Sequence, residues 1–216
     1  KAISSAWQLP LFRLDMGKVY SGLAGNPERA FDRVIQTVEA VAPCILWVDE
    51  IENAIGGSHT SMEGGTAGRI FARFLTWMQE KTAMVFVAAT ANRIESLPAE
   101  ILRKGRFDQL FFLDLPSEKE RMDIYRVHLV RRGQDITKFN LVSLGKGSRN
   151  FSGAEIEQVV LNALTDVTVA GRALTENDLF KSLGSMVPLA TTMAEQIKAI
   201  KSWAHDRALK AGKEMQ

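Results

Sequence analysis

The chain has 216 residues, of which 46% are hydrophobic, and a formal net charge of +2. This length and apolar content predict a globular protein with one or two domains. The near-neutral charge disfavours a nucleic-acid or anionic-membrane partner, because such surfaces attract clusters of Lys and Arg.

The sequence shows no visible signal for membrane insertion or secretion. No apolar run reaches the ~20 residues that a membrane-spanning helix needs, and no signal peptide is visible. The one cysteine, Cys44, has no partner for an internal disulfide, which is consistent with a reducing compartment. We therefore expect a cytoplasmic protein. Because the chain begins at Lys1 without Met, targeting from this end stays open.

The first part of the chain alternates predicted strands and helices. A helix start is marked by Asn26-Pro27-Glu28, with an Asn cap, Pro at the first helical position and an acid in the first turn. Strands separated by helices indicate a parallel sheet with both faces covered. The predicted strands are residues 9–15, 44–48, 84–90 and 110–113, and helical apolar spacing covers residues 30–41 and 70–78.

From Ser117 onward the pattern is helical, and each predicted helix opens with a capping box. The pairs are Ser117/Glu120, Ser152/Glu155, Thr175/Asp178 and Thr192/Glu195. The change near Pro116 predicts two parts: an α/β nucleotide-binding subdomain at residues 1–116 and a helical subdomain at residues 117–216.

Two adjacent acids, Asp49 and Glu50, end the apolar run that begins at Cys44. At the end of a buried strand their side chains would diverge at the sheet edge. This arrangement suits a Walker B element, in which the first acid holds a Mg²⁺ shell and the second polarises a water. A strand that simply ends in acids at the solvent boundary explains the pattern equally well.

A polar amide, Asn92, follows the next predicted strand and would reach the same sheet edge as the two acids. An Asn there can hold an attacking water or contact a terminal phosphate. In isolation, a turn residue after a strand is the simpler interpretation.

Two arginines, Arg103 and Arg106, flank Gly105. Guanidinium groups suit phosphate because they are planar, permanently charged and bidentate. A lone pair of this kind is usually a solvated or ion-paired surface feature.

Small residues at the start of another helix, Gly153 and Ala154, would allow a nucleotide to approach closely. A capping box followed by small residues also forms without any bound ligand, so this pattern alone does not require a nucleotide.

In this order the motifs resemble those of the AAA+ ATPases, in the AAA subfamily proper, over essentially the whole chain. The resemblance implies a P-loop NTPase fold: an α/β parallel sheet, N-terminally truncated, followed by an all-helical lid subdomain. Asp49-Glu50 matches Walker B, Asn92 matches sensor 1, and residues 102–108 match the second region of homology.

The same resemblance implies the site residues. Asp49 would hold Mg²⁺, Glu50 would act as the base and Asn92 would position water. Arg103 and Arg106 look like arginine fingers, which act on the nucleotide of a neighbouring subunit. The lid residues that match contacts to adenine and ribose are Ile124, His128, Gly153 and Ala154.

A narrower resemblance is to AAA proteins encoded by a conserved open reading frame in cyanobacteria and many algal plastids, with bacterial relatives. It rests on residues 74–81, residues 102–108 and a tail from Val187 to Ala204. It implies an ATPase, located in the plastid stroma if the source is an alga, and leaves the client unspecified.

Two departures from the family pattern matter. The phosphate loop, G-x-x-x-x-G-K-[ST], is absent from these residues, and we expect it just upstream of Lys1. These residues alone are therefore expected to bind ATP poorly and to be inactive. At the central pore, Leu23 stands where AAA translocases carry an aromatic, so a flexible connection and a polypeptide-gripping loop are equally plausible.

The resemblance thus implies an ATPase module that uses ATP and Mg²⁺, assembles as a ring-like homo-oligomer (expected to be a hexamer), and remodels a protein client. The alternative is a non-hydrolysing scaffold or regulatory module with the same fold. A DNA motor is disfavoured by the charge. An intact upstream phosphate loop would favour the enzyme.

Overall fold

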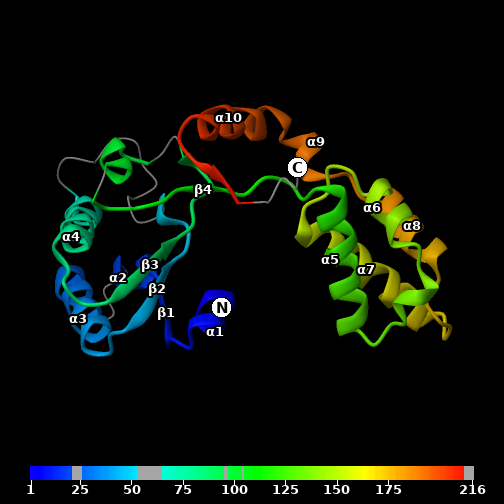
Figure 1. Cartoon of the computed structure of the whole chain (residues 1–216), viewed down its shortest axis with the longest axis horizontal. Helices are drawn as coiled ribbons and strands as arrows, with labels where there is room; N and C mark the ends of the chain where they lie inside the picture. The colour runs from blue at the N-terminus through cyan, green and yellow to red at the C-terminus, as the bar shows by residue number, and fades with distance from the viewer. Residues whose placement is uncertain (21–25, 53–64, 95–96, 104, 212–216) are drawn as a thin grey trace. The chain divides into compact units, whose positions relative to one another are not determined.

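The computed structural model describes residues 1–20, 26–52, 65–94, 97–103 and 105–211. Two compact units, Lys1–Asp108 and Gln109–Gln216, divide the chain (Figure 1). Each unit has its own cluster of buried hydrophobic side chains. The sequence pattern changes near Pro116, and the compact units divide at Asp108.

The first unit is built on a three-stranded parallel sheet with the order β1-β2-β3. The strands are β1 (Leu11–Leu14), β2 (Cys44–Val48) and β3 (Val85–Ala89). The central strand β2 is almost entirely apolar because both of its faces are covered. Its register places Val48 beside Leu14 on one side and beside Ala89 on the other. All three strands therefore end at one edge of the sheet.

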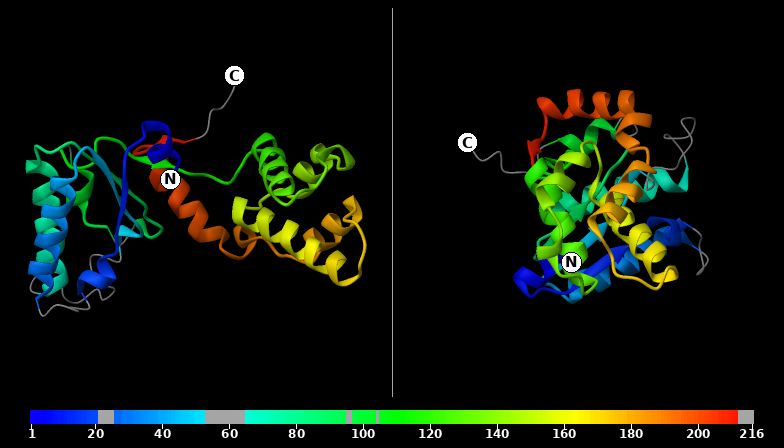
Figure 2. Two further views of the ribbon diagram at one scale, coloured as in Figure 1. Left: turned by 90° about the horizontal axis from the view of Figure 1, so that it is seen from below. Right: turned by 90° about the vertical axis from the view of Figure 1, so that its right-hand side faces the viewer.

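Helices cover both faces of this sheet. They are α1 (Ala2–Trp7), α2 (Met16–Tyr20), α3 (Pro27–Ala40) and α4 (Thr66–Glu80), with a short 3₁₀ helix at Ala99–Leu102. Helices α3 and α4 lie side by side along the sheet (Figure 2). Side chains alternate between the faces of a strand, so Leu46 and Val48 join the same core cluster as Phe31 of α3 and Phe74 of α4. On the other face Trp7 of α1 meets Phe86 edge to face, with ring centroids 4.9 Å apart.

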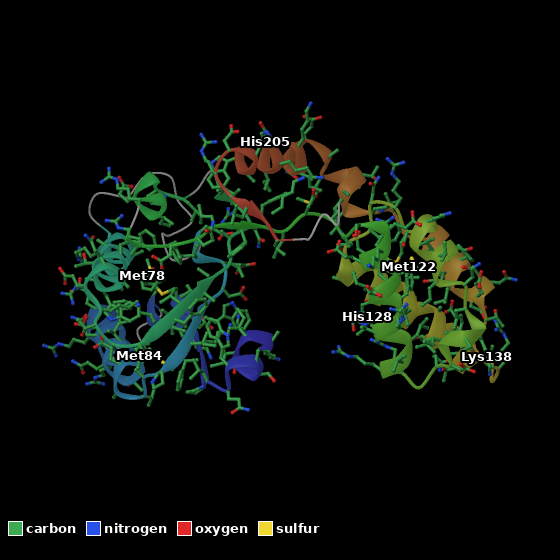
Figure 3. All side chains as sticks on the ribbon, viewed as in Figure 1. Met78, Met84, Met122, His128, Lys138 and His205 are labelled. Atoms are coloured by element: carbon green, nitrogen blue, oxygen red, sulfur yellow. The ribbon has the colours of Figure 1, made fainter. Side chains whose placement is uncertain are left out.

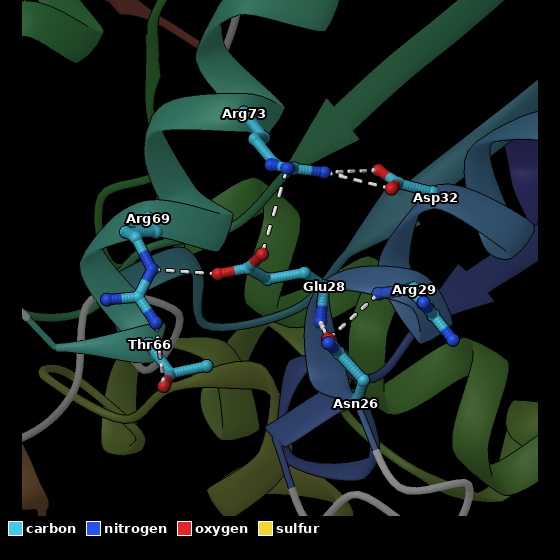
Figure 4. A network of polar contacts seen from close by, with 7 residues as sticks. All are labelled: Asn26, Glu28, Arg29, Asp32, Thr66, Arg69 and Arg73. Atoms are coloured by element: carbon cyan, nitrogen blue, oxygen red, sulfur yellow. Dashed lines mark hydrogen bonds and ion pairs between the residues drawn. The ribbon is translucent and has the colours of Figure 1, made fainter.

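The predicted start of α3 is confirmed. The Asn26 side chain accepts hydrogen bonds from the backbone N–H groups of Glu28 and Arg29, and Pro27 is the first helical residue. Ion pairs then join α3 to α4: Arg69 Nε lies 2.7 Å from Glu28 Oε1, and Arg73 contacts Asp32 (Figure 4). These exposed pairs orient the helices but add little stability, since such pairs typically contribute ~0–1 kcal/mol each.

Side chains from α3, α4 and the sheet make the core of the first unit. Phe31 of α3 and Phe74 of α4 are fully buried and pack edge to face. Burying an aromatic or aliphatic side chain of this size contributes about 1.5–3 kcal/mol. The predicted burial of Cys44 is confirmed, with 0% of the residue exposed. This core fixes the strand ends on which the candidate site stands.

The second unit is mainly helical. Its helices are α5 (Glu118–Arg131), a 3₁₀ helix (Ile136–Lys138), α6 (Leu141–Gly147), α7 (Gly153–Val169), α8 (Glu176–Gly184), α9 (Leu189–Thr192) and α10 (Ala194–His205). Helix α5 packs against α6 and α7, and α7 packs against α8. Their core contains Tyr125, Leu129, Ile156 and Val159, each fully buried. Burial raises the pKa of Tyr125 to about 12.

Three of the four predicted capping boxes are present, at Ser117/Glu120, Ser152/Glu155 and Thr175/Asp178. The fourth is wrong. Thr192 is the last residue of α9, where its hydroxyl donates to the carbonyl of Leu189, and α10 begins after Met193 without a side-chain cap. A Thr followed three residues later by Glu marks a helix start only when the Thr itself is not helical.

The expected strand at residues 110–113 also needs correction. Strand β4 covers Phe111–Phe112 and pairs with β5 (Leu209–Lys210) in a separate parallel two-stranded sheet. The N–H of Leu209 donates to the carbonyl of Leu110, and the N–H of Ala211 donates to Phe112. The second unit is therefore not purely helical. The described helices do not combine the length and apolar character that a membrane crossing requires.

Candidate functional site

The two acids predicted as a site lie directly after the central strand β2. Asp49 is half-buried and Glu50 is exposed. Glu50 has φ +49°, in the left-handed region that few non-glycine residues adopt. Such conformations persist where the surrounding structure holds them, and they are concentrated at functional sites. The turn that ends β2 is therefore fixed by its neighbours rather than by its own backbone preference.

The structure brings Asn92 to this turn, as the sequence predicts. Its side-chain Nδ2 donates a hydrogen bond to Oε1 of Glu50, at 3.3 Å. The contact arises because β2 and β3 are parallel neighbours, so the residues after their carboxyl ends meet at one edge. A carboxylate and an amide are thus held side by side on the surface.

Thr90 was not predicted from the sequence, although it joins the two acids. Its Oγ1 donates to Oδ1 of Asp49 at 2.7 Å and accepts from the backbone N–H of Glu50 at 3.0 Å. A threonine that ends an apolar strand gives no distinctive sequence signal. Its proximity to the acids depends on the register between β2 and β3, in which Val48 faces Ala89.

Glu52 is a second residue that the sequence analysis missed. It is 4% exposed, and its Oε1 accepts from the backbone N–H groups of Asn92, at 2.9 Å, and Arg93, at 3.2 Å. A buried carboxylate is costly unless hydrogen bonds compensate it. Glu52 therefore anchors the backbone that carries Asn92.

A positive charge faces the first acid. Nη2 of Arg13, on β1, lies 3.3 Å from Oδ2 of Asp49, and its guanidinium carbon lies 5.1 Å from the centroid of the Trp47 ring. The Arg13 side chain is 58% exposed, so this ion pair is solvated and weak. The sequence pattern gave no signal for it either.

The chemistry of this edge suits a magnesium-bound triphosphate. The polar groups at this edge are the carboxylates of Asp49 and Glu50, the hydroxyl of Thr90 and the amide of Asn92. Mg²⁺ prefers oxygen ligands and is usually held by one or two carboxylates together with substrate phosphates. Within the described residues, no cluster of three or more His, Cys, Asp or Glu could hold a metal by itself. The Asp49 and Glu50 carboxylates at this edge are ligands of the kind that Mg²⁺ takes alongside phosphate oxygens.

The predicted arginines lie elsewhere in the first unit, and both contact Glu100. Nη2 of Arg103 is 3.9 Å from Oε1 of Glu100, and 70% of the Arg103 side chain is exposed. Arg106 donates through Nη1 to the backbone carbonyl of Glu100. Gly105 between them has φ +88°, which only glycine adopts readily. Arg103 is thus presented to solvent, whereas Arg106 is folded back.

In the second unit the predicted lid residues come together where α5 meets the start of α7. A Cβ on Gly153 would lie 3.5 Å from Cδ1 of Ile124, and Ala154 next to it is exposed. His128 lies one turn beyond Ile124 on α5 (Figure 3), with its side chain 14% exposed. These four residues form one half-exposed patch of small, apolar and imidazole groups.

A small polar network orients His128. Its Nδ1 lies 3.3 Å from Oε1 of Glu157 and 3.1 Å from Nη1 of Arg132. Arg132 also donates to Glu157 at 2.8 Å, and this contact lowers the pKa of the Glu157 carboxyl. The imidazole is therefore held between a carboxylate and a guanidinium.

One sequence prediction falls outside the described residues: Leu23, the pore-loop candidate, lies in residues 21–25.

A parallel α/β unit with polar groups at the carboxyl edge of its sheet, followed by a mainly helical unit, is consistent with a truncated P-loop NTPase fold. Residues 1–115 match the family described as ATPase family associated with various cellular activities (AAA). The chain therefore belongs to the AAA family.

Relatives with this domain match most of the chain. The AAA domain-containing protein ycf46 of Pyropia yezoensis is 45% identical over 207 residues, which are 95% of this chain and 42% of that protein. The corresponding protein of Guillardia theta is 43% identical over 205 residues, 94% of this chain and 40% of that protein. The chain thus spans about two-fifths of the length of these relatives. A Dictyostelium discoideum protein described as a putative ribosome biogenesis ATPase is 31% identical over 172 residues, covering 76% of this chain and 19% of that protein.

Proposed function

We propose that this chain is the catalytic part of an AAA ATPase that binds and hydrolyses magnesium-bound ATP, in a protein that also supplies a phosphate loop. The observation that carries the proposal is the contact between Asn92 and Glu50 next to Asp49, at the sheet edge where α/β folds bind ligands. Membership of the AAA family supports it.

Each polar group then has a role that its position permits. Asp49 would hold the metal, which when bound neutralises charge on the phosphate oxygens. Glu50 is exposed and can accept a proton from a water. Asn92, held by Glu52 through its backbone, can orient that water with its amide.

The patch on α5 and α7 would hold the base and ribose. A Cβ on Gly153 would lie 3.5 Å from Cδ1 of Ile124, and the neighbouring Ala154 is small and exposed. His128 is oriented by Glu157 and could stack on or hydrogen-bond to a purine. We propose that these residues contact the nucleotide from the lid.

The arginines would act on a neighbouring subunit's nucleotide in a ring-like homo-oligomer, expected to be a hexamer. The exposure of Arg103 supports this role, since a guanidinium facing solvent is available to another molecule. Arg106 would have to leave the carbonyl of Glu100 to take part.

We further propose that hydrolysis drives remodelling of a protein client. Family membership supports this use of ATP. The Dictyostelium relative is described as a putative ribosome biogenesis ATPase.

The test is ATP hydrolysis by a protein that carries both these residues and the phosphate loop. Glu50→Gln should keep ATP binding and lower turnover by roughly 10²–10⁴-fold, the usual contribution of a general base. Glu80→Gln, at the exposed end of α4, is the matched control and should change neither quantity. Binding of ATP without hydrolysis by the parent protein would instead support the scaffold alternative.

A mixing experiment tests the arginines separately. Subunits with Arg106→Ala and subunits with Glu50→Gln should each be nearly inactive, whereas a mixture should regain part of the activity. The gain arises because some interfaces pair an intact base with an intact arginine, and an arginine supplied in trans can contribute about 10³–10⁵-fold in rate. No gain in proven mixed oligomers would make Arg106 a structural residue.

A further inference from the structure

One residue directly after β3, Thr90, contacts four consecutive residues at the end of β2 through its backbone and its hydroxyl. The backbone N–H of Thr90 donates to the carbonyl of Val48 at 3.0 Å, and its own carbonyl accepts from Ile51 at 2.9 Å. Between these two bonds, its Oγ1 donates to Asp49 and accepts from the N–H of Glu50. The whole turn is therefore tied to a single residue of the neighbouring strand.

The Glu50 backbone depends on this tie. Its φ of +49° is unfavourable for a residue with a Cβ. The side-chain oxygen of Thr90, 3.0 Å away, gives the Glu50 N–H an acceptor in this conformation. The same conformation directs the Glu50 carboxylate to the amide of Asn92. Loss of the acceptor would allow the turn to relax and would move the carboxylate.

We propose that Thr90 is a positioning residue for ATP hydrolysis, fixing the direction of both Asp49 and Glu50 through its hydroxyl. The inference rests on the proposed function. A hydroxyl is both a donor and an acceptor at one atom, which is what Asp49 and the Glu50 N–H together require. Valine has nearly the same shape as threonine and can do neither.

The experiment compares Thr90→Val, Thr90→Ala and Thr90→Ser in the protein that carries the phosphate loop. Both variants without a hydroxyl should lose about 10–100-fold in kcat, the usual effect of removing a group that orients a ligating carboxylate. KM for ATP should change little, because the adenine and ribose contacts stay intact. Thr90→Ser should restore most of the rate, since it keeps the hydroxyl.

A matched control separates this effect from the general loss of a threonine hydroxyl. Thr37 lies on α3, where its Oγ1 donates to the carbonyl of Arg33 at 2.8 Å. Thr37→Val should leave kcat and KM unchanged.

A double-mutant comparison tests whether Thr90 acts through Glu50. In the Glu50→Gln background, Thr90→Val should lower kcat much less than it does in the parent, because residues that act as one unit are not additive. An equal fold-loss in both backgrounds would mean a merely structural role and would overturn the proposal.

The remaining outcomes distinguish this proposal from the function on which it rests. If the parent shows no ATP hydrolysis, both fail. If the parent hydrolyses ATP and the folded variants without a hydroxyl remain within about twofold of it in kcat, only the Thr90 proposal fails. Thr90→Ser as impaired as Thr90→Val would also overturn it.

Discussion

The two units hold their candidate functional groups by different means. In the first unit, Asp49, Glu50 and Asn92 lie beyond the ends of strands and are oriented by hydrogen bonds across the sheet. In the second, Ile124 and Gly153 lie on helices and are brought together by the packing of α5 on α7. Polar side chains beyond a strand end are held in one direction only if groups on the neighbouring strand bond to them. Apolar side chains on a packed helix are held in place by the packing of the helix itself.

This difference suits the two tasks that we propose for these units. Hydrolysis needs a proton acceptor and a metal ligand in fixed directions, which hydrogen bonds provide. Holding a base and sugar needs a smooth, sterically defined surface, which small and apolar side chains provide. Substitutions in each unit can separate these two kinds of positioning.

The largest expected effects are on the separate cores. Phe74→Ala in the first unit should cost about 3–5 kcal/mol and Leu129→Ala in the second about 2–5, because both side chains are almost completely buried. Hydrogen exchange read by mass spectrometry should show lost protection mainly in the unit that carries the substitution, since the two cores are distinct clusters. Equal loss of protection in both units would mean that they unfold as one.

Two glycines of the second unit should respond differently to an added methyl group. A Cβ on Gly145 would lie 2.7 Å from Cγ of Met122 and 3.2 Å from the carbonyl oxygen of Glu118. Gly145→Ala should therefore destabilise the unit by roughly 1–3 kcal/mol through overpacking. Gly153→Ala meets Ile124 at an ordinary 3.5 Å and should change stability by less than about 0.5 kcal/mol.

Urea unfolding followed by circular dichroism measures both glycine variants. Gly153→Ala also tests the patch on α5 and α7 proposed to hold the base and ribose. A methyl group there should weaken nucleotide binding without a loss of stability. A stable Gly145→Ala would show that Met122 moves aside freely.

Removing a capping box should lower the stability by a smaller amount. Ser152→Ala removes the two hydrogen bonds that the Ser152 hydroxyl makes with Glu155 at the start of α7 and should cost about 1 kcal/mol. Thr192→Ala is the matched control, because the Thr192 hydroxyl bonds only locally within α9 and caps no helix. Denaturant midpoints should fall for the first variant and stay nearly unchanged for the second.

The smallest effect concerns acid stability. Burial by itself would raise the pKa of Glu155, but donation from the backbone N–H of Leu189 and from Ser152 outweighs it, and the pKa is lowered. A lowered folded-state pKa means that this stabilisation is present above the ordinary glutamate value of about 4.3 and is lost as the pH falls through the folded value.

Thermal unfolding at a series of acidic pH values tests this assignment. Below the ordinary glutamate pKa the parent should lose more stability than Glu155→Gln, which cannot titrate. Parallel pH profiles for the two proteins would exclude Glu155 as the group responsible.

Local sequence signals predicted much of the fold. The cap at Asn26 and the boxes at Ser117, Ser152 and Thr175 were predictable because each is formed by residues close in sequence. The pairing of β4 with β5 was not, because it joins Phe111–Phe112 to Leu209–Lys210 far along the chain. A two-residue strand carries no alternation to detect.

The candidate site shows the same division. Asp49, Glu50 and Asn92 each follow an apolar strand, so topology alone predicts that they meet. Thr90 and Glu52 depend on register and on the direction of a turn with positive φ, neither of which the pattern of residue types specifies. The sequence thus indicated which groups meet at the candidate site and missed those that hold them in place.

The most direct test of the central claim identifies the nucleotide bound to the protein after incubation with ATP. The protein must carry the phosphate loop, and the nucleotide is released by denaturation and separated by chromatography. If Glu50 accepts the proton from water beside Asp49 and Asn92, the parent should yield mainly ADP and Glu50→Gln mainly ATP. ADP in equal proportion from both proteins would contradict this account, because the bond would then break without the Glu50 carboxylate.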